Sequence, residues 1–164
     1  MATRRTMAAL LVWLFSVGAF FLSLNAQGLP ETYRKGVDLA LAKLHSLSGI
    51  QDHYVFLRSV SKSDYEMGFD VSFFYHHFYL KPTTCEKGTT DSSACEPRND
   101  RPLMDCAVCY RMHRGEIEPE PKPYIHCLRK PAITQAMTAG RLEHCNKLGY
   151  SSGSTVLLGS TGKE

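Results

Sequence analysis

The strongest hydrophobic pattern in the chain lies between Phe69 and Lys81. Apolar side chains occur there at both odd and even positions, so they fall on both faces of a strand. The even face is Phe74, His76, Phe78 and Leu80, and the odd face is Phe69, Val71, Phe73, Tyr75, His77 and Tyr79. Because an antiparallel sheet usually buries one face, we expect a helix on the even face. The odd face then needs cover from elsewhere, or it is a partner surface.

A helical spacing of apolar residues precedes this strand, from Thr32 to Ser46. Pro30 before its first turn and the Ser48-Gly49 pair after its last turn are typical helix boundaries. Further strands are predicted at residues 53–61, 103–114 and 124–129, with a polar turn at 61–68 and weak helical character at 132–144. The pattern predicts an α+β domain in which one long N-terminal helix lies across a four-stranded antiparallel sheet.

The two ends of the chain differ from this middle part. Residues 1–26 combine Arg4 and Arg5 with an apolar run from Met7 to Leu22 and a small residue, Ala26. This order is typical of a secretory signal peptide, and the run is shorter than the roughly 20 residues of a membrane anchor. We therefore expect a secreted, extracellular protein with no membrane span in its mature form, a domain at 27–148 and a flexible C-terminal tail at 149–164.

The charge balance limits the choice of partners. The chain has 19 Lys and Arg against 16 Asp and Glu, and two of the basic residues belong to the expected signal peptide. A mature chain so close to neutral argues against general nucleic-acid binding. A local basic patch of Arg98, Arg101, Arg111 and Arg114 is conceivable, but a solvated face explains these residues more simply.

All six cysteines lie between residues 85 and 145. After a signal peptide they favour disulfides, although spacing alone leaves 15 pairings open. The alternative is a zinc site that combines Cys106 and Cys109 with the pairs His126-Cys127 and His144-Cys145. We expect no metal, no cofactor and no catalytic residues, because no histidine has the spacing of a nucleophile–base pair. His76 is expected to be a hydrogen-bonded core residue.

Several short motifs suggest a family. The long strand ends in the sequence LKPTTC at 80–85, and CAVC at 106–109, YIHC at 124–127 and ITQ at 133–135 follow before Cys145. Over roughly residues 30–150 this order resembles the cystatin and cathelicidin superfamily, and within it a branch of secreted chemoattractants. The six-cysteine spacing is the specific part of the resemblance.

The resemblance implies a function. Members of this branch are precursors of a chemoattractant and adipokine that acts in chemotaxis, inflammation, adipocyte differentiation and metabolism. Processing proteases trim the C-terminal tail, and the product activates a chemokine-like G-protein-coupled receptor. The implied disulfides are Cys85–Cys95, Cys106–Cys127 and Cys109–Cys145. The implied receptor-activating residues are Tyr150, Gly153, Val156, Leu157 and Leu158, the last three standing where the branch has aromatic residues.

Other members of the superfamily suggest alternatives. A cystatin-like inhibitor of cysteine proteases uses a Q-x-V-x-G hairpin, which corresponds here to residues 64–68, DYEMG. Only Gly68 matches, and Asp64 and Glu66 add charges to a wedge that should be desolvated. A cathelicidin-like antimicrobial peptide is disfavoured because only Lys147 and Lys163 are basic after Cys145.

Overall fold

The computed structural model describes residues 28–150. The expected signal peptide and the tail beyond Tyr150 lie outside the described residues. By its internal contacts the chain divides at Pro30 into two units, and all of the described helices and strands belong to the unit that begins at Glu31. The elements in chain order are helix α2 (Glu31–Ser46), strands β1 (Asp52–Gly68), β2 (Val71–Glu86), β3 (Met104–His113), β4 (Glu116–Ile117) and β5 (Tyr124–Arg129), a 3-10 turn (Lys130–Ala132) and helix α3 (Gln135–Tyr150).

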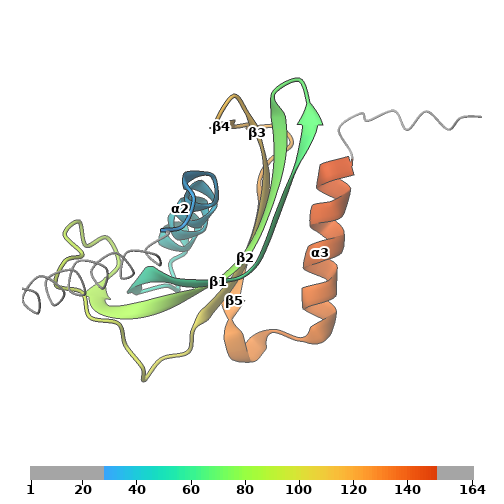
Figure 1. The fold of residues 1–164 in the computed structure, drawn as a ribbon. Helices are drawn as coiled ribbons and strands as arrows, with labels where there is room; N and C mark the ends of the chain where they lie inside the picture. Colours follow the sequence, from blue (N-terminus) through green and yellow to red (C-terminus); the bar gives the residue numbers. More distant parts are fainter. Residues whose placement is uncertain (1–27, 151–164) are drawn as a thin grey trace, which may run out of the picture. The chain divides into compact units, whose positions relative to one another are not determined.

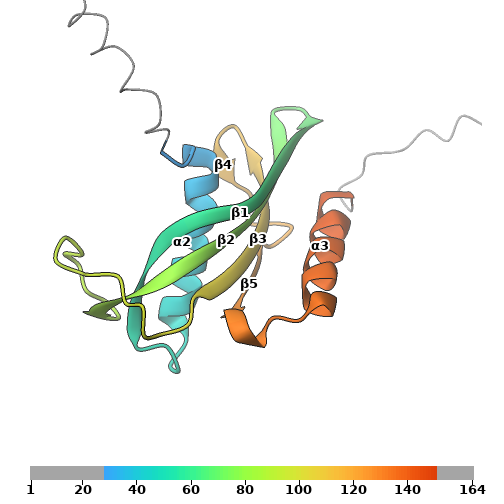
Figure 2. The same ribbon diagram turned by 60° about the horizontal axis from the view of Figure 1, so that its bottom comes forward.

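The strands form one antiparallel sheet in which β2 lies between β1 and β3. Both β4 and β5 pair with β3, along different parts of its length. The two helices pack on opposite faces of the sheet, as Figures 1 and 2 show. The protein is therefore an α+β structure in which a helix crosses an antiparallel sheet.

Helix α2 covers the even face of β2, as the hydrophobic pattern predicts. Phe78 and Leu80 are fully buried beneath it, and Tyr33 of α2 meets Phe74 edge to face at 5.6 Å between ring centroids. The buried stripe of the helix is Tyr33, Gly36, Val37, Ala40 and Leu44. This spacing repeats every three or four residues, so one side of α2 forms the main core with the sheet.

Gly36 in the middle of α2 has a packing reason. A Cβ atom there would lie 2.8 Å from Cε1 of Tyr110 on β3. The Tyr110 hydroxyl donates a hydrogen bond to the carbonyl of Thr32 on the same helix, and burial raises its pKa. The glycine therefore lowers the intrinsic helix propensity but permits the close approach of helix and sheet.

The predicted polar turn at residues 61–68 is wrong. Strand β1 continues to Gly68, and its polar residues pair with β2, with Asp64 opposite Phe74 and Glu66 opposite Ser72. Most side chains in this part of β1 are exposed, because β1 is an edge strand of the sheet. Exposure on an edge strand removes the apolar alternation that normally reveals a strand.

The prediction of one long N-terminal helix is also incomplete. Helix α3 has 16 residues, the same number as α2, and it includes the first two residues of the segment predicted to be a tail. The described sheet has five strands, because the short β4 adds to the four predicted. Between residues 28 and 150, no helix is long and apolar enough to cross a membrane.

Candidate functional site: the helix that leads into the tail

Helix α3 determines where the C-terminal tail starts. Of the predicted receptor-activating residues, only Tyr150 falls within the described chain, as the last residue of α3. Gly153, Val156, Leu157 and Leu158 lie outside the described residues. The structure therefore describes how the last turn of α3, which precedes the tail, is attached to the sheet.

Only a narrow stripe of α3 is in contact with the sheet. Arg141, Cys145 and Gly149 are buried and Leu148 is half-buried, so these residues recur at helical spacing. The remaining side is open, and even the apolar Met137 and Leu142 are 41% and 47% exposed. The helix is thus attached at a few points.

One of these points is covalent. The Cys109–Cys145 disulfide joins β3 to α3, while Cys106–Cys127 joins β3 to β5 and Cys85–Cys95 closes the loop that follows β2. These are the pairs that the family resemblance implies. The four cysteines considered as zinc ligands are all in disulfides, so they have no thiolate to offer a metal. Residues 28–150 contain no group of three candidate metal ligands.

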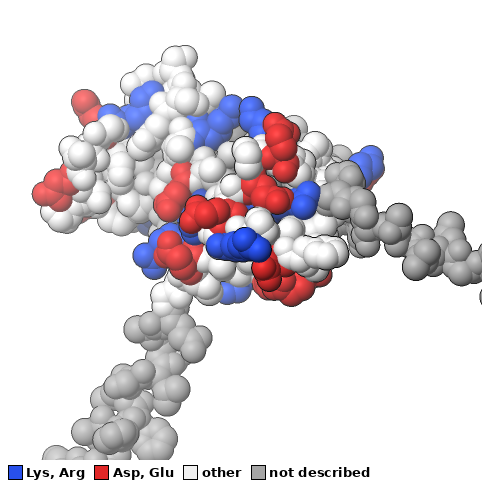
Figure 3. All heavy atoms as spheres, turned by 90° about the horizontal axis from the view of Figure 1, so that it is seen from above, with Lys and Arg blue, Asp and Glu red and all other residues white. Residues whose placement is uncertain are grey.

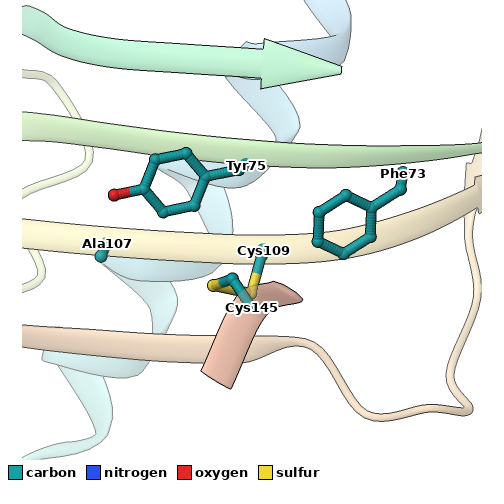
Figure 4. Packing of buried hydrophobic residues seen from close by; sticks show 5 residues of the cluster. All are labelled: Phe73, Tyr75, Ala107, Cys109 and Cys145. Atoms are coloured by element: carbon teal, nitrogen blue, oxygen red, sulfur yellow. A yellow bond between two sulfur atoms is a disulfide. The ribbon is translucent and has the colours of Figure 1, made fainter. Parts of the chain in front are cut away.

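Around the Cys109–Cys145 disulfide, α3 covers the odd face of β2. Phe73 and Tyr75 project from β2 toward the disulfide, and Ala107 lies beside it on β3, as Figure 4 shows. Met67, Tyr124 and Leu148 extend this cluster at its margin. The odd-face residues nearest the middle of the strand are therefore covered by the chain itself.

A second attachment point is polar. Arg141 of α3 is 2% exposed, and its guanidinium donates to the carboxylate of Asp105 on β3 and to the Asp105 carbonyl at 3.1 Å. Its Nε donates to Nδ1 of His126 on β5 at 2.7 Å, and Nη2 donates to the His126 carbonyl at 3.3 Å. The Asp105 carboxylate also lies 3.0 Å from Nε2 of His77 on β2. One guanidinium thus links α3 to two strands.

This polar cluster determines the protonation of His126. Burial lowers the pKa of His126, and the positive charge of Arg141 lowers it further. The neutral ring leaves a lone pair on Nδ1, which accepts the hydrogen bond from Arg141. Since the charges of Arg141 and Asp105 are buried together, removal of either one leaves the other uncompensated.

The last turn of α3 lies against β1. His144 stacks on Tyr124 of β5 with 4.2 Å between ring centroids, one turn before the tail. Gly149 touches Tyr65 so closely that a Cβ atom there would collide with the Tyr65 hydroxyl. Tyr65 in turn packs on Phe73, with 5.2 Å between centroids. The tail therefore starts at a fixed position beside the end of β1.

Residues 64–68, which correspond in sequence to the cystatin hairpin, belong to strand β1 and not to a loop. Asp64 accepts a hydrogen bond from the Tyr33 hydroxyl, and Glu66 accepts one from the hydroxyl of Ser72 at 3.0 Å. The turn between β1 and β2 instead consists of Phe69 and Asp70. Both carboxylates are therefore engaged along the hairpin rather than presented at its end, Asp64 by helix α2 and Glu66 by the neighbouring strand β2.

Three of the four arginines considered as a basic patch, Arg98, Arg111 and Arg114, are paired with acidic side chains. Arg98 lies 3.6 Å from the Asp52 carboxylate and also pairs with Asp100, and it holds the pKa of Asp100 down to about 2. Arg111 pairs with Glu118 at 3.0 Å, and Arg114 pairs with Asp70 at 3.4 Å. Figure 3 shows basic and acidic side chains interspersed on the end of the molecule seen from above.

Comparison with known proteins gives only distant likenesses among solved structures. No protein-family model matches the chain, and no curated protein matches it. A solved structure described as "Crystal structure of Al-CPI" is 15% identical with a TM-score of 0.41, and the match covers 61% of this chain and 86% of that one.

Proposed function

We propose that this chain is a secreted signalling precursor similar to chemerin, which is also called retinoic acid receptor responder protein 2. In this proposal a cystatin-like domain carries the C-terminal tail, and proteases trim the tail to its active form. The trimmed protein then activates a chemokine-like G-protein-coupled receptor as a chemoattractant and adipokine. The chain itself is not an enzyme and needs no cofactor.

One observation carries this proposal: α3 is attached to the sheet mainly through Cys145 and Arg141. Both attachments act on the segment immediately before the tail. Helix α3 helps to cover Phe73 and Tyr75, but its most specific contacts, the disulfide and the buried arginine, hold the segment immediately before the tail. The cysteine spacing and three disulfides support secretion, because disulfides persist in oxidising compartments.

The composition of the tail supports the same role. Val156, Leu157 and Leu158 are apolar in a segment otherwise rich in Gly, Ser and Thr. Burial of each in a receptor pocket would contribute roughly 1.5 to 3 kcal/mol, which offsets the cost of ordering the segment. The charged residues Lys163 and Glu164 oppose entry into an apolar pocket, which gives trimming a physical purpose.

A receptor-signalling assay on three proteins tests the proposal. The proteins are the full chain after signal removal, the chain truncated after Ser160 and the chain truncated after Tyr150. We expect the strongest signal from truncation after Ser160 and none from truncation after Tyr150. Equal signalling by both truncated proteins would show that the tail is not the active part.

A second candidate is a cystatin-like inhibitor of cysteine proteases. The turn between β1 and β2 lies beside the turn between β3 and β4, since the Arg114 N–H donates to the Asp70 carbonyl at 3.2 Å. Two adjacent hairpin turns form the kind of edge that enters a protease cleft. A papain inhibition assay on the intact domain separates the candidates, because inhibition there does not depend on trimming of the tail.

A further inference from the structure

The turn between β1 and β2 contains an exposed aromatic residue in an unfavourable conformation. Gly68 pairs with Val71, so Phe69 and Asp70 alone form the turn, with φ of 53° and 60°. A two-residue turn with both φ values positive favours Asn, Asp or Gly. Asp70 meets this preference, whereas a left-handed φ is a genuine outlier for a bulky residue such as Phe69.

No packing compensates for this conformation within the described domain. Phe69 is 98% exposed, which is the highest value of any large apolar residue between residues 28 and 150. The backbone of the turn is nevertheless fixed, because Asp70 accepts the hydrogen bond from Arg114 and pairs with its guanidinium at 3.4 Å. Strained residues that a rigid surrounding holds in place occur preferentially at ligand-contacting sites.

The exposed ring of Phe69 lies at the same end of the domain as the last turn of α3, which precedes the tail. Gly149 touches Tyr65, and β1 rises by roughly 10 Å from Tyr65 to its last residue, Gly68, which precedes Phe69. Figures 1 and 2 show the end of α3 and the β1–β2 turn at this common end. A typical interface patch of about 800 Å² is roughly 30 Å across, so one partner surface can contact both. Residues 151–160, which remain after truncation at Ser160, would span at most roughly 35 Å when extended, enough to reach a pocket within that partner.

We propose that Phe69 is a second docking point for the receptor that receives the tail, and that its ring enters an apolar recess on the extracellular surface of that receptor. This inference rests on the proposed function. An aromatic ring is suited to the role, because single buried aromatic side chains often supply much of the affinity of an interface. Asp70, the charged neighbour of the ring, is neutralised by its ion pair with Arg114, so apolar contact is the main interaction that the ring itself offers.

The variant Phe69→Asn, in protein truncated after Ser160, tests this inference. Asparagine accepts the left-handed turn conformation, so the hairpin stays intact and the urea midpoint of unfolding stays equal or rises. We expect the concentration for half-maximal signalling to rise at least tenfold, with an unchanged maximal response. The control Leu142→Gln removes an exposed apolar residue from the open side of α3 and leaves that concentration unchanged.

The outcomes separate this inference from the proposed function. If the parent truncated after Ser160 signals and Phe69→Asn matches it at every concentration, the docking role of Phe69 is wrong and the tail remains the active part. If the parent does not signal, both proposals fail. If Phe69→Asn signals normally but inhibits papain less well than the parent, the turn belongs to a protease-binding edge and the receptor contact is wrong.

Discussion

Helices α2 and α3 have 16 residues each and pack on opposite faces of the same strands, but they are held in different ways. Helix α2 buries a continuous apolar stripe that includes Val37, Ala40 and Leu44. Helix α3 is attached through a disulfide, a buried arginine and a short contact at its last turn. Apolar packing of α2 stabilises the core along the whole helix, whereas α3 is held to the sheet at separate points.

The largest expected effect concerns the polar attachment. Substitution of Arg141→Met leaves Asp105 buried without its main partner, and we expect a loss of about 3 to 5 kcal/mol in the free energy of unfolding. Urea unfolding at pH 7 measures this loss. The double variant Asp105→Leu with Arg141→Met should lose clearly less than the single variant, because no charge remains uncompensated. A loss below 1 kcal/mol for Arg141→Met would mean that α3 does not depend on this arginine.

The next prediction concerns the covalent attachment. The Cys109–Cys145 disulfide spans 36 residues in sequence, and its removal by alanine substitution should cost roughly 4 kcal/mol. The matched control is the Cys85–Cys95 disulfide, which spans 10 residues and should cost roughly 3 kcal/mol. Hydrogen exchange sharpens the comparison, because only the first variant should lose protection across α3. Equal loss of protection in α3 for both variants would contradict a specific role for Cys145.

The difference between the helices also explains what the sequence could predict. The position of α2 and the face of β2 that it covers follow from apolar periodicity, because burial of a stripe leaves a repeating pattern. Helix α3 lacks such a pattern, so only weak helical character at 132–144 was predicted. The disulfide pairs follow from the family resemblance and not from spacing.

The buried polar cluster was missed altogether. Asp105 stands within the otherwise apolar strand β3, and an isolated carboxylate there is a signal that a buried cation must lie nearby. The sequence does not tell which of the many basic residues supplies it, since Arg141 and His126 meet Asp105 only in the folded chain. The β1–β2 turn was misplaced for a related reason, because exposed edge strands and loops have similar composition.

A smaller loss of stability is expected at low pH, from a histidine on the face of the sheet that α2 covers. His76 is fully buried beneath α2, its Nε2 lies 2.8 Å from the Ser59 hydroxyl, and burial lowers its pKa to about 4. The unfolded state binds a proton below its ordinary pKa of about 6.5, so stability is lost as the pH falls from there through the folded-state value. This loss reaches about 3 kcal/mol at most. In urea unfolding at pH 7 and pH 4.5, His76→Leu should clearly reduce the difference, part of which also comes from His126, and the exposed control His45→Gln should leave it unchanged.

The smallest expected effects come from the same substitution, glycine to alanine, made in each of the two helices. Gly36 in α2 faces the Tyr110 ring, whereas a Cβ atom on Gly140 in α3 meets nothing within 4 Å. Alanine raises the intrinsic helix propensity at both sites by about 1 kcal/mol. We expect Gly140→Ala to gain this amount, because that side of α3 is open. Gly36→Ala should instead lose about 1 kcal/mol or more, since overpacking against the buried Tyr110 exceeds the gain in propensity. Thermal unfolding of both variants gives the two signs directly. A stabilised Gly36→Ala would show that α2 can move away from the sheet, and that the apolar side of the molecule is less tightly fixed than the side held by Arg141 and Cys145.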